Sequence, residues 1–169
     1  MKETDQENVQ CPGCGVILPN RQIEPDLRYN ASGECYQKFG ELTFYTVGKQ
    51  DIGFIHQHAI DAYSAQHAGG GMKPIAAAFA LIGLYYALEH GFDGRQVQRV
   101  HSLLARRKFK WLPLEPPEKA YSITVCHVLD APPEKRDVML RRWMLDVWDC
   151  WSHRHKWVRE TCSALLDNY

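Results

Sequence analysis

The sequence has no excess charge of either sign, because its 20 Lys and Arg residues are matched by 20 Asp and Glu residues. A chain with zero formal net charge has no long-range field that would draw it to nucleic acid or to an anionic membrane. It also has no long apolar run, since the longest, Ile75–Leu88, is shorter than the roughly 20 residues that cross a bilayer. We therefore expect no membrane span, and we interpret this run as a buried helix.

A secretion signal is also missing, because Met1–Gln10 is polar and acidic and has no apolar segment. We expect a cytosolic protein, in which thiols stay reduced. The six cysteines are then metal ligands, reactive thiols or core residues rather than three disulfides. The chain has no internal repeat, and its 169 residues suit one domain with a substantial core.

Motifs of several enzyme classes are absent as well. The chain contains no HExxH sequence, no phosphate-binding loop and no recognisable nucleophile motif, each of which would point to a particular reaction. The reaction class therefore stays open, and the chemically informative residues are the cysteines and histidines.

The first motif is Cys11-Pro12-Gly13-Cys14-Gly15. A Pro-Gly turn closed by glycine aims both sulfurs at one centre, while backbone amides point at the sulfurs. We interpret this motif as a zinc knuckle. Two free thiols in a loop are the alternative, and a redox CxxC is less favoured because that motif normally begins a helix.

A structural zinc site takes four protein ligands, so a single CxxC needs two more. Ser32 can cap a helix over residues 33–47, and Cys35 then lies in its first turn, where the helix dipole favours a thiolate. We predict Cys35 as the third ligand and a histidine as the fourth. The alternative for Cys35 is a buried apolar cysteine.

The chain from His56 to His67 is rich in groups that bind metals or transfer protons. Asp51 can cap a helix over residues 52–67. His56 and His67 then lie roughly 16 Å apart along the axis, so they cannot both bind one ion. We assign His67 to the cysteine site and His56 to a separate cavity, although the spacing alone leaves open which histidine completes the site.

Two further polar residues of this helix, His58 and Asp61, are three positions apart and can share an ion or hydrogen-bond to each other. Tyr63 can orient a substrate through its hydroxyl. The alternative for any one of these residues is an ordinary core or surface position.

The remaining pattern predicts an all-α, single-domain bundle of about five to six helices, with a disordered tail over residues 1–10 and the domain over residues 11–169. Helices are expected over residues 73–89, 94–107 and 123–129 and, in one long stretch, 134–167. His155 lies on the tryptophan side of that last helix, so it is the histidine expected to reach an interior site. The alternative is a histidine packed between tryptophans with a single hydrogen bond.

The stretch Arg106–Trp111 mixes cations with aromatic residues, a pattern that can meet nucleic acid. Cations also favour the C-terminus of a helix, and the zero net charge makes this solvated-surface interpretation the preferred one. A nucleic-acid partner is therefore ranked last.

Taken together, these motifs resemble an uncharacterised bacterial family of domains of unknown function with an N-terminal CPxCG knuckle and a His…DAYxxQH helix. The resemblance extends from Cys11 to about Arg159 and maps onto Cys11, Cys14, Cys35, His56, Asp61, Tyr63, Gln66, His67, His155 and Arg159. Where that family commonly has proline after the second histidine, this chain has Ala68, which loosens the turn but removes no ligand. The resemblance supports a site and implies no reaction.

Two functions compete on these grounds. In the first, the protein binds a metal, expected to be Zn²⁺, and is a metal-dependent enzyme of unknown reaction, with catalytic candidates His56, Asp61, Tyr63 and His155 as acid–base groups or as ligands of a second, open metal. In the second, it is a zinc-stabilised binding or regulatory module, with Cys11, Cys14, Cys35 and His67 as metal ligands and no catalysis. The partner is an unidentified small molecule or protein, and the oligomeric state stays open.

Overall fold

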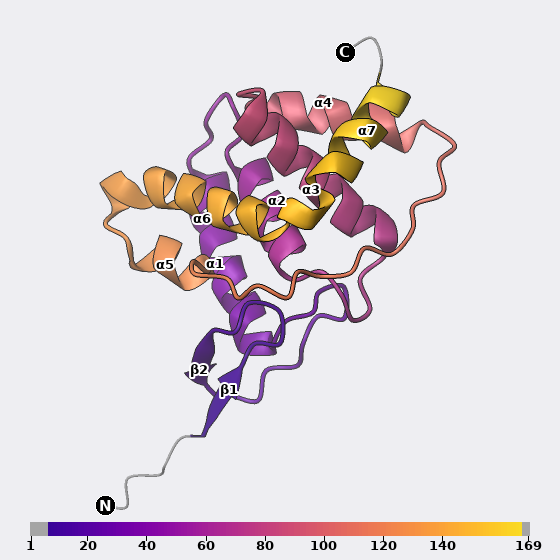
Figure 1. The fold of residues 1–169 in the computed structure, drawn as a ribbon. Coiled ribbons are helices and arrows are strands. Elements are labelled where there is room, and N and C mark those ends of the chain that lie inside the picture. Colours follow the sequence, from indigo (N-terminus) through magenta and orange to yellow (C-terminus); the bar gives the residue numbers. More distant parts are fainter. Residues whose placement is uncertain (1–6, 167–169) are drawn as a thin grey trace, which may run out of the picture.

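The computed structural model describes residues 7–166, which form seven α-helices and one small hairpin (Figure 1). The helical class is confirmed, with more helices than expected and with two short strands in addition. The elements are β1 (Asn8–Gln10), β2 (Ile17–Pro19), α1 (Gly33–Gly48), α2 (His56–Gln66), α3 (Pro74–Glu89), α4 (Gly94–Ala105), α5 (Val125–Asp130), α6 (Arg136–Cys150) and α7 (His155–Leu165), with short 3-10 helices at Pro133–Lys135 and Ser152–Arg154.

The two strands pair antiparallel and place the knuckle motif in the turn between them, with Val9 opposite Leu18. The expected disordered tail over residues 1–10 therefore extends too far, because Asn8–Gln10 is β1. The turn brings the flanking backbones into register, which allows the short ladder to form. Residues 1–6 lie outside the described part of the chain.

Helix α2 lies at the centre of the bundle and packs against α1, α3, α4 and α6. Its contact faces carry small residues, since Ala59, Ala62 and Ala65 are fully buried. Small side chains let the neighbouring backbones approach closely, so α2 can be covered on several sides at once. The C-terminal end of α2 is thereby held in a fixed position, and this end carries His67.

The start of α2 differs from the prediction. The helix begins at His56 rather than at Ile52, because Gln50 and Phe54 adopt positive φ angles of 49° and 52°. The Asp51 carboxylate accepts a hydrogen bond from the Ile55 amide at 2.9 Å and closes this turn. Ile52 is consequently 96% exposed and does not belong to the inner face.

The long C-terminal helix is also corrected, because the chain breaks it into α6, a 3-10 turn and α7. The break lies at Trp151, whose indole is buried and donates to the Ala65 carbonyl in α2 at 3.1 Å. The freed Trp148 carbonyl accepts from the Trp151 amide at 3.0 Å and from His155 Nε2 at 2.8 Å. The buried position and hydrogen bond of Trp151 thus end α6 here, although the apolar spacing of the sequence predicts one continuous helix. Asp167 lies outside the described residues.

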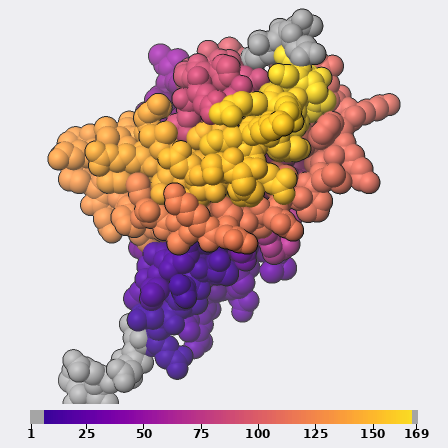
Figure 2. Space-filling model, viewed as in Figure 1, coloured from indigo at the N-terminus to yellow at the C-terminus, as the bar shows by residue number. Residues whose placement is uncertain are grey.

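An extended segment over residues 107–122 connects α4 to α5 and crosses the molecule between the N-terminal hairpin and α6 (Figures 1 and 2). Leu114 anchors this segment in the core, and His153 Nε2 lies 3.3 Å from the Glu115 carbonyl. Over residues 7–166, no helix is both long enough and apolar enough to span a membrane.

Candidate metal centre

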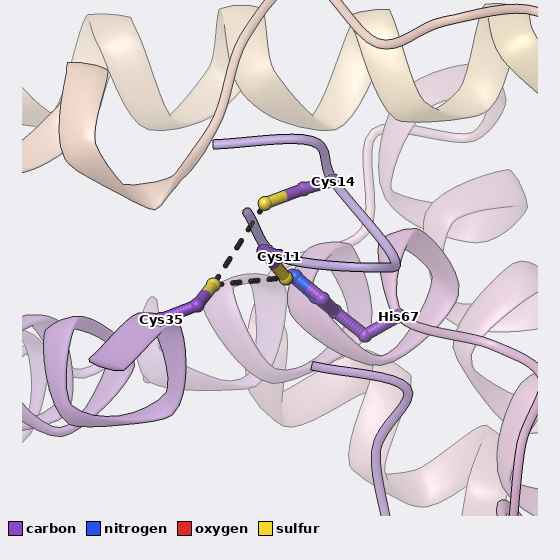
Figure 3. A group of neighbouring side chains, drawn as sticks. All are labelled: Cys11, Cys14, Cys35 and His67. Atoms are coloured by element: carbon purple, nitrogen blue, oxygen red, sulfur yellow. Dashed lines mark hydrogen bonds between the residues drawn. The ribbon is translucent and has the colours of Figure 1, made fainter. Parts of the chain in front are cut away.

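Cys11 and Cys14 lie in the hairpin turn, which backbone hydrogen bonds close tightly. The Cys11 amide donates to the Val16 carbonyl at 2.8 Å, and the Gly15 amide donates to the Cys11 carbonyl at 2.9 Å. Gly15 has a φ of +78°, a left-handed conformation that glycine adopts without a steric penalty. The turn directs both thiols towards the helical bundle (Figure 3).

Gly13 allows the knuckle to lie directly against the bundle. A Cβ at this position would lie 2.3 Å from the Asn30 carbonyl oxygen and 2.7 Å from His67 Cδ2. The Asn30 backbone and the buried His67 ring cannot shift without disturbing the bundle, so a larger residue at position 13 would push the knuckle outwards. Gly13, at the variable position of the CPxCG motif, therefore allows the close contact with Asn30 and with His67 at the end of α2.

Cys35 lies in the first turn of α1, as the sequence predicts. The Ser32 hydroxyl caps the helix by accepting from the Cys35 amide at 3.2 Å. The buried Glu34 carboxylate accepts from the Arg21 and Ile23 amides at 2.9 and 3.2 Å. These bonds fix the chain that leads from the hairpin into α1, and hence the position of the Cys35 sulfur.

His67 follows the last residue of α2 and is fully buried. Its Nδ1 lies 2.8 Å from the Tyr63 carbonyl oxygen, which can only accept, so Nδ1 carries the proton and donates. Nε2 is then the atom with a free electron pair, as in a metal-binding histidine. The Asn30 amide donates to the His67 carbonyl at 2.9 Å and holds the backbone at the same point.

These four side chains converge from the hairpin, α1 and the end of α2 (Figure 3). The Cys35 sulfur lies 3.8 Å from the Cys14 sulfur and 3.4 Å from His67 Nε2. All four ligand atoms lie within 4.8 Å of one another, and all four residues are buried. Three sulfurs and one imidazole nitrogen form a donor set that transition metals take, so the cluster can hold one metal ion. No other group of three or more such residues occurs between residues 7 and 166.

The three thiols influence one another's protonation strongly. Hydrogen bonds from Cys14 and Cys35, with a further contribution from His67, lower the pKa of Cys11. The hydrogen bond with Cys11 in turn raises the pKa of Cys14 to about 12, and contacts with Cys11 and Cys14 raise the pKa of Cys35. The lowered pKa of Cys11 favours its thiolate form.

Tyr63 contacts two members of the cluster, Cys35 and His67. Its hydroxyl donates to the Cys35 sulfur at 3.5 Å, and its ring stacks on His67 and Phe39 at centroid distances of 3.9 and 4.1 Å. Burial, followed by the neighbouring Cys35, raises the pKa of Tyr63, which keeps the hydroxyl a donor. Tyr63, predicted as a catalytic residue, therefore lies against the Cys35 sulfur, where it can position that side chain.

The other predicted catalytic residues of α2 do not join the cluster. His56 Nδ1 lies 2.8 Å from the Thr46 hydroxyl at the opposite end of the helix, and burial lowers the pKa of His56. Asp61 is buried against α3, where its Oδ1 accepts from the Gln57 side chain at 3.0 Å. No hydrogen bond joins His58 to Asp61, whose one hydrogen-bond partner is Gln57, so the hydrogen bond considered for these two residues is not formed.

His155 lies at the start of α7, where its ring stacks on Trp148 at 3.8 Å and its Nε2 donates to the Trp148 carbonyl. The structure thus matches the packed alternative for His155, with a hydrogen bond at the helix break. Arg159 forms an exposed ion pair with Glu89 at 2.6 Å. Neither residue contacts the four side chains of the cluster.

Sequence reasoning overlooked some supporting residues. Asn30 holds the His67 backbone, and Phe39 stacks on Tyr63. The signal for Phe39 was available, because it lies one helical turn after Cys35 on the buried face of α1. Asn30 lies in an irregular loop, and nothing in its local sequence indicates its partner.

Searches among curated proteins and among solved structures return no match to this chain. A comparison with protein families matches residues 9–152, which contain all of the hairpin except Asn8, the cluster and helices α1 to α6. The chain therefore belongs to DUF5946, a family of unknown function.

Proposed function

We propose that Zn²⁺ binds at Cys11, Cys14, Cys35 and His67 and that the protein is a zinc-stabilised binding or regulatory module. The observation that carries this proposal is the convergence of four buried ligand atoms within 4.8 Å of one another. Zinc favours tetrahedral sites of cysteine and histidine, and a site with four protein ligands is of the structural kind. Reduced thiols are needed for it, which suits the cytosol.

The metal would join the hairpin to the bundle. Two of the ligands come from the hairpin turn, and the other two come from α1 and the end of α2. The short ladder of β1 and β2 buries little apolar surface, since Ile17 is 61% exposed, and an isolated two-stranded hairpin is marginally stable. Zinc would therefore supply much of the free energy that holds this hairpin against the helices.

The metal content of the purified protein tests this proposal. We expect one equivalent of zinc in the natural protein and almost none in Cys14→Ser, whereas Cys126→Ser, which changes a cysteine outside the cluster, should retain one equivalent. A chelator should also lower the Tm of the natural protein by several degrees, because a ligand that binds only the folded state stabilises it by mass action. A protein that purifies folded without metal, or a Cys14→Ser variant that keeps its zinc, would refute the proposal.

A metal-dependent enzyme is the second candidate, and one observation favours it. A cavity of about 370 Å³ adjoins the knuckle and is lined by Cys11, Cys14, Lys119 and Tyr121, among others. A substrate in this cavity would lie beside the metal. Catalysis would require one of the four protein ligands to dissociate so that the substrate could bind the metal in its place. The d–d spectrum of the Co²⁺-substituted protein distinguishes the two: a tetrahedral spectrum that added small ligands leave unchanged supports the module.

A further inference from the structure

A second cavity lies beside α2, between the loop that precedes α1 and the start of α3. Its volume of about 480 Å³ is within the range of small-molecule sites, which are mostly apolar with a few polar groups. The apolar wall is formed by Leu27, Tyr29, Met72 and Ile75, and the polar groups are those of Asp26, Arg28, Ser64 and Lys73. None of the four metal-binding candidates lines it, so this site goes beyond the function proposed above.

The apolar rim of this cavity is left uncovered by the protein itself. Leu27 is 80% exposed and Ile75 is 37% exposed, and both line the cavity. The Tyr29 ring is fixed from behind, since it packs edge-on against Tyr63 at 5.2 Å. A ligand with an apolar body would therefore cover exposed side chains against a rigid wall, which favours binding because little has to be ordered.

The charged groups of the cavity leave one cation unpaired. Asp26 and Arg28 neutralise each other, because Arg28 Nη2 lies 2.6 Å from Asp26 Oδ2 and its Nε contacts both carboxylate oxygens. Lys73, which also lines the cavity, forms no ion pair within residues 7–166. The lining therefore has a net positive charge at the edge of an apolar surface, and this arrangement selects an anionic head group on an apolar body.

We propose that this cavity binds a small amphiphilic carboxylate. Its carboxylate would pair with the Lys73 ammonium, and its apolar body would lie on Leu27, Tyr29, Met72 and Ile75. Ser64, which is buried and lines the cavity, adds a hydroxyl group to its wall. The ligand is a free small molecule, because the volume of about 480 Å³ is in the range of small-molecule sites.

Isothermal titration calorimetry with sodium octanoate tests this site on the protein as purified. We expect saturable binding at one site per chain, with weaker binding of octanol, which lacks the charge, and of butyrate, which lacks most of the apolar body. Lys73→Gln should weaken octanoate binding about fivefold, as expected for one solvent-accessible ion pair. Lys108→Gln, which changes an exposed lysine outside the cavity, should leave the affinity unchanged.

A second variant tests the cavity by filling it. Ala76 lines the cavity and is exposed at the start of α3, so Ala76→Trp should fold normally and reduce octanoate affinity at least tenfold. Ala105→Trp, at an exposed position in α4, is the matched control and should bind normally. The proposal is overturned if octanoate does not saturate, if octanol binds as tightly as octanoate, or if Ala76→Trp binds like the natural protein. Zinc content is measured in every sample, so failure here is distinguishable from failure of the metal site.

Discussion

Asp61 gives the sharpest quantitative prediction, because the fold leaves its carboxyl group almost without polar partners. It is fully enclosed between α2 and α3, and Oδ1 accepts its one hydrogen bond from Gln57. Oδ2 has no hydrogen-bond partner among the described residues, and it lies so close to Gly83 that a Cβ there would be 2.0 Å away. Burial raises the pKa of Asp61 well above its ordinary value, and the Gln57 bond offsets this only in part.

A raised pKa means that the folded protein holds a proton on Asp61 where the unfolded chain has released it. The resulting stability is fully present below the unfolded pKa of about 3.9 and is lost as the pH rises towards the folded pKa. The loss amounts to about 1.4 kcal/mol for each pH unit within that interval. Asp61→Asn has nearly the same shape and no titrating group, so it should not show this loss.

We therefore predict that the free energy of unfolding of Asp61→Asn, minus that of the natural protein, increases with pH by about 1.4 kcal/mol per unit from pH 4.5 upwards. Urea unfolding, followed by tryptophan fluorescence at pH 4.5, 5.5 and 6.5 in excess zinc, measures this difference. Taking the difference cancels the titration of the cysteine cluster, which both proteins share. Asp149→Asn, at an exposed position, shows the effect of removing one negative charge at the surface.

The reasoning would be refuted by parallel pH profiles for the two proteins over this interval. It would be refuted equally by a difference that falls with pH, because Asp61 would then be ionised and stabilised in the folded state. The slope of this free-energy difference against pH is the decisive quantity. Any pH-independent cost of placing an amide against Gly83 shifts the difference by the same amount at every pH.

Two further predictions concern neighbouring positions. Tyr63→Phe removes the hydroxyl that donates to Cys35 but keeps the stacked ring. We expect a folded protein whose metal affinity, measured by chelator competition, falls about 10- to 100-fold. An unchanged affinity would show that the hydroxyl does not support Cys35 as a ligand. Gly83→Ala should lower the free energy of unfolding by about 1–3 kcal/mol through its clash with Asp61, whereas Gly40→Ala in α1, where an added Cβ meets nothing within 4 Å, should raise it by about 0.5–1 kcal/mol. Thermal unfolding of both glycine variants checks the opposite signs.

Local signals in the sequence were sufficient for several elements. The predicted Ser32 cap is present at the start of α1, and α4 begins at Gly94 as expected, because a cap depends on side chains only a few residues away. The start of α2 and the break after α6 were predicted wrongly for the opposite reason. A positive φ at Phe54 and the anchoring of Trp151 to the Ala65 carbonyl depend on contacts that helical periodicity does not describe.

The candidate site divides in the same way. The knuckle with Cys11 and Cys14 is a local motif, whereas Cys35 and a histidine were predicted because a zinc site needs four ligands. The structure brings Cys35 and His67 to the knuckle, and the sequence spacing alone did not decide between the histidines. The contact between Asp61 in α2 and Gly83 in α3 could not be predicted from the sequence. Many other pairs of residues could meet where two helices cross closely.

The end of α2 makes the cluster and the core one structural unit. Gln66, adjacent to His67, accepts from the Trp143 indole at 3.0 Å and donates to the Ile123 carbonyl at 2.7 Å. A metal that fixes His67 also fixes Gln66, and through it the packing of α6 on α2. Metal loss should therefore extend beyond the hairpin to Trp143, and tryptophan emission should shift as zinc is removed. If the emission stayed constant while the hairpin detached, the two regions would be independent and α2 would not transmit the binding event.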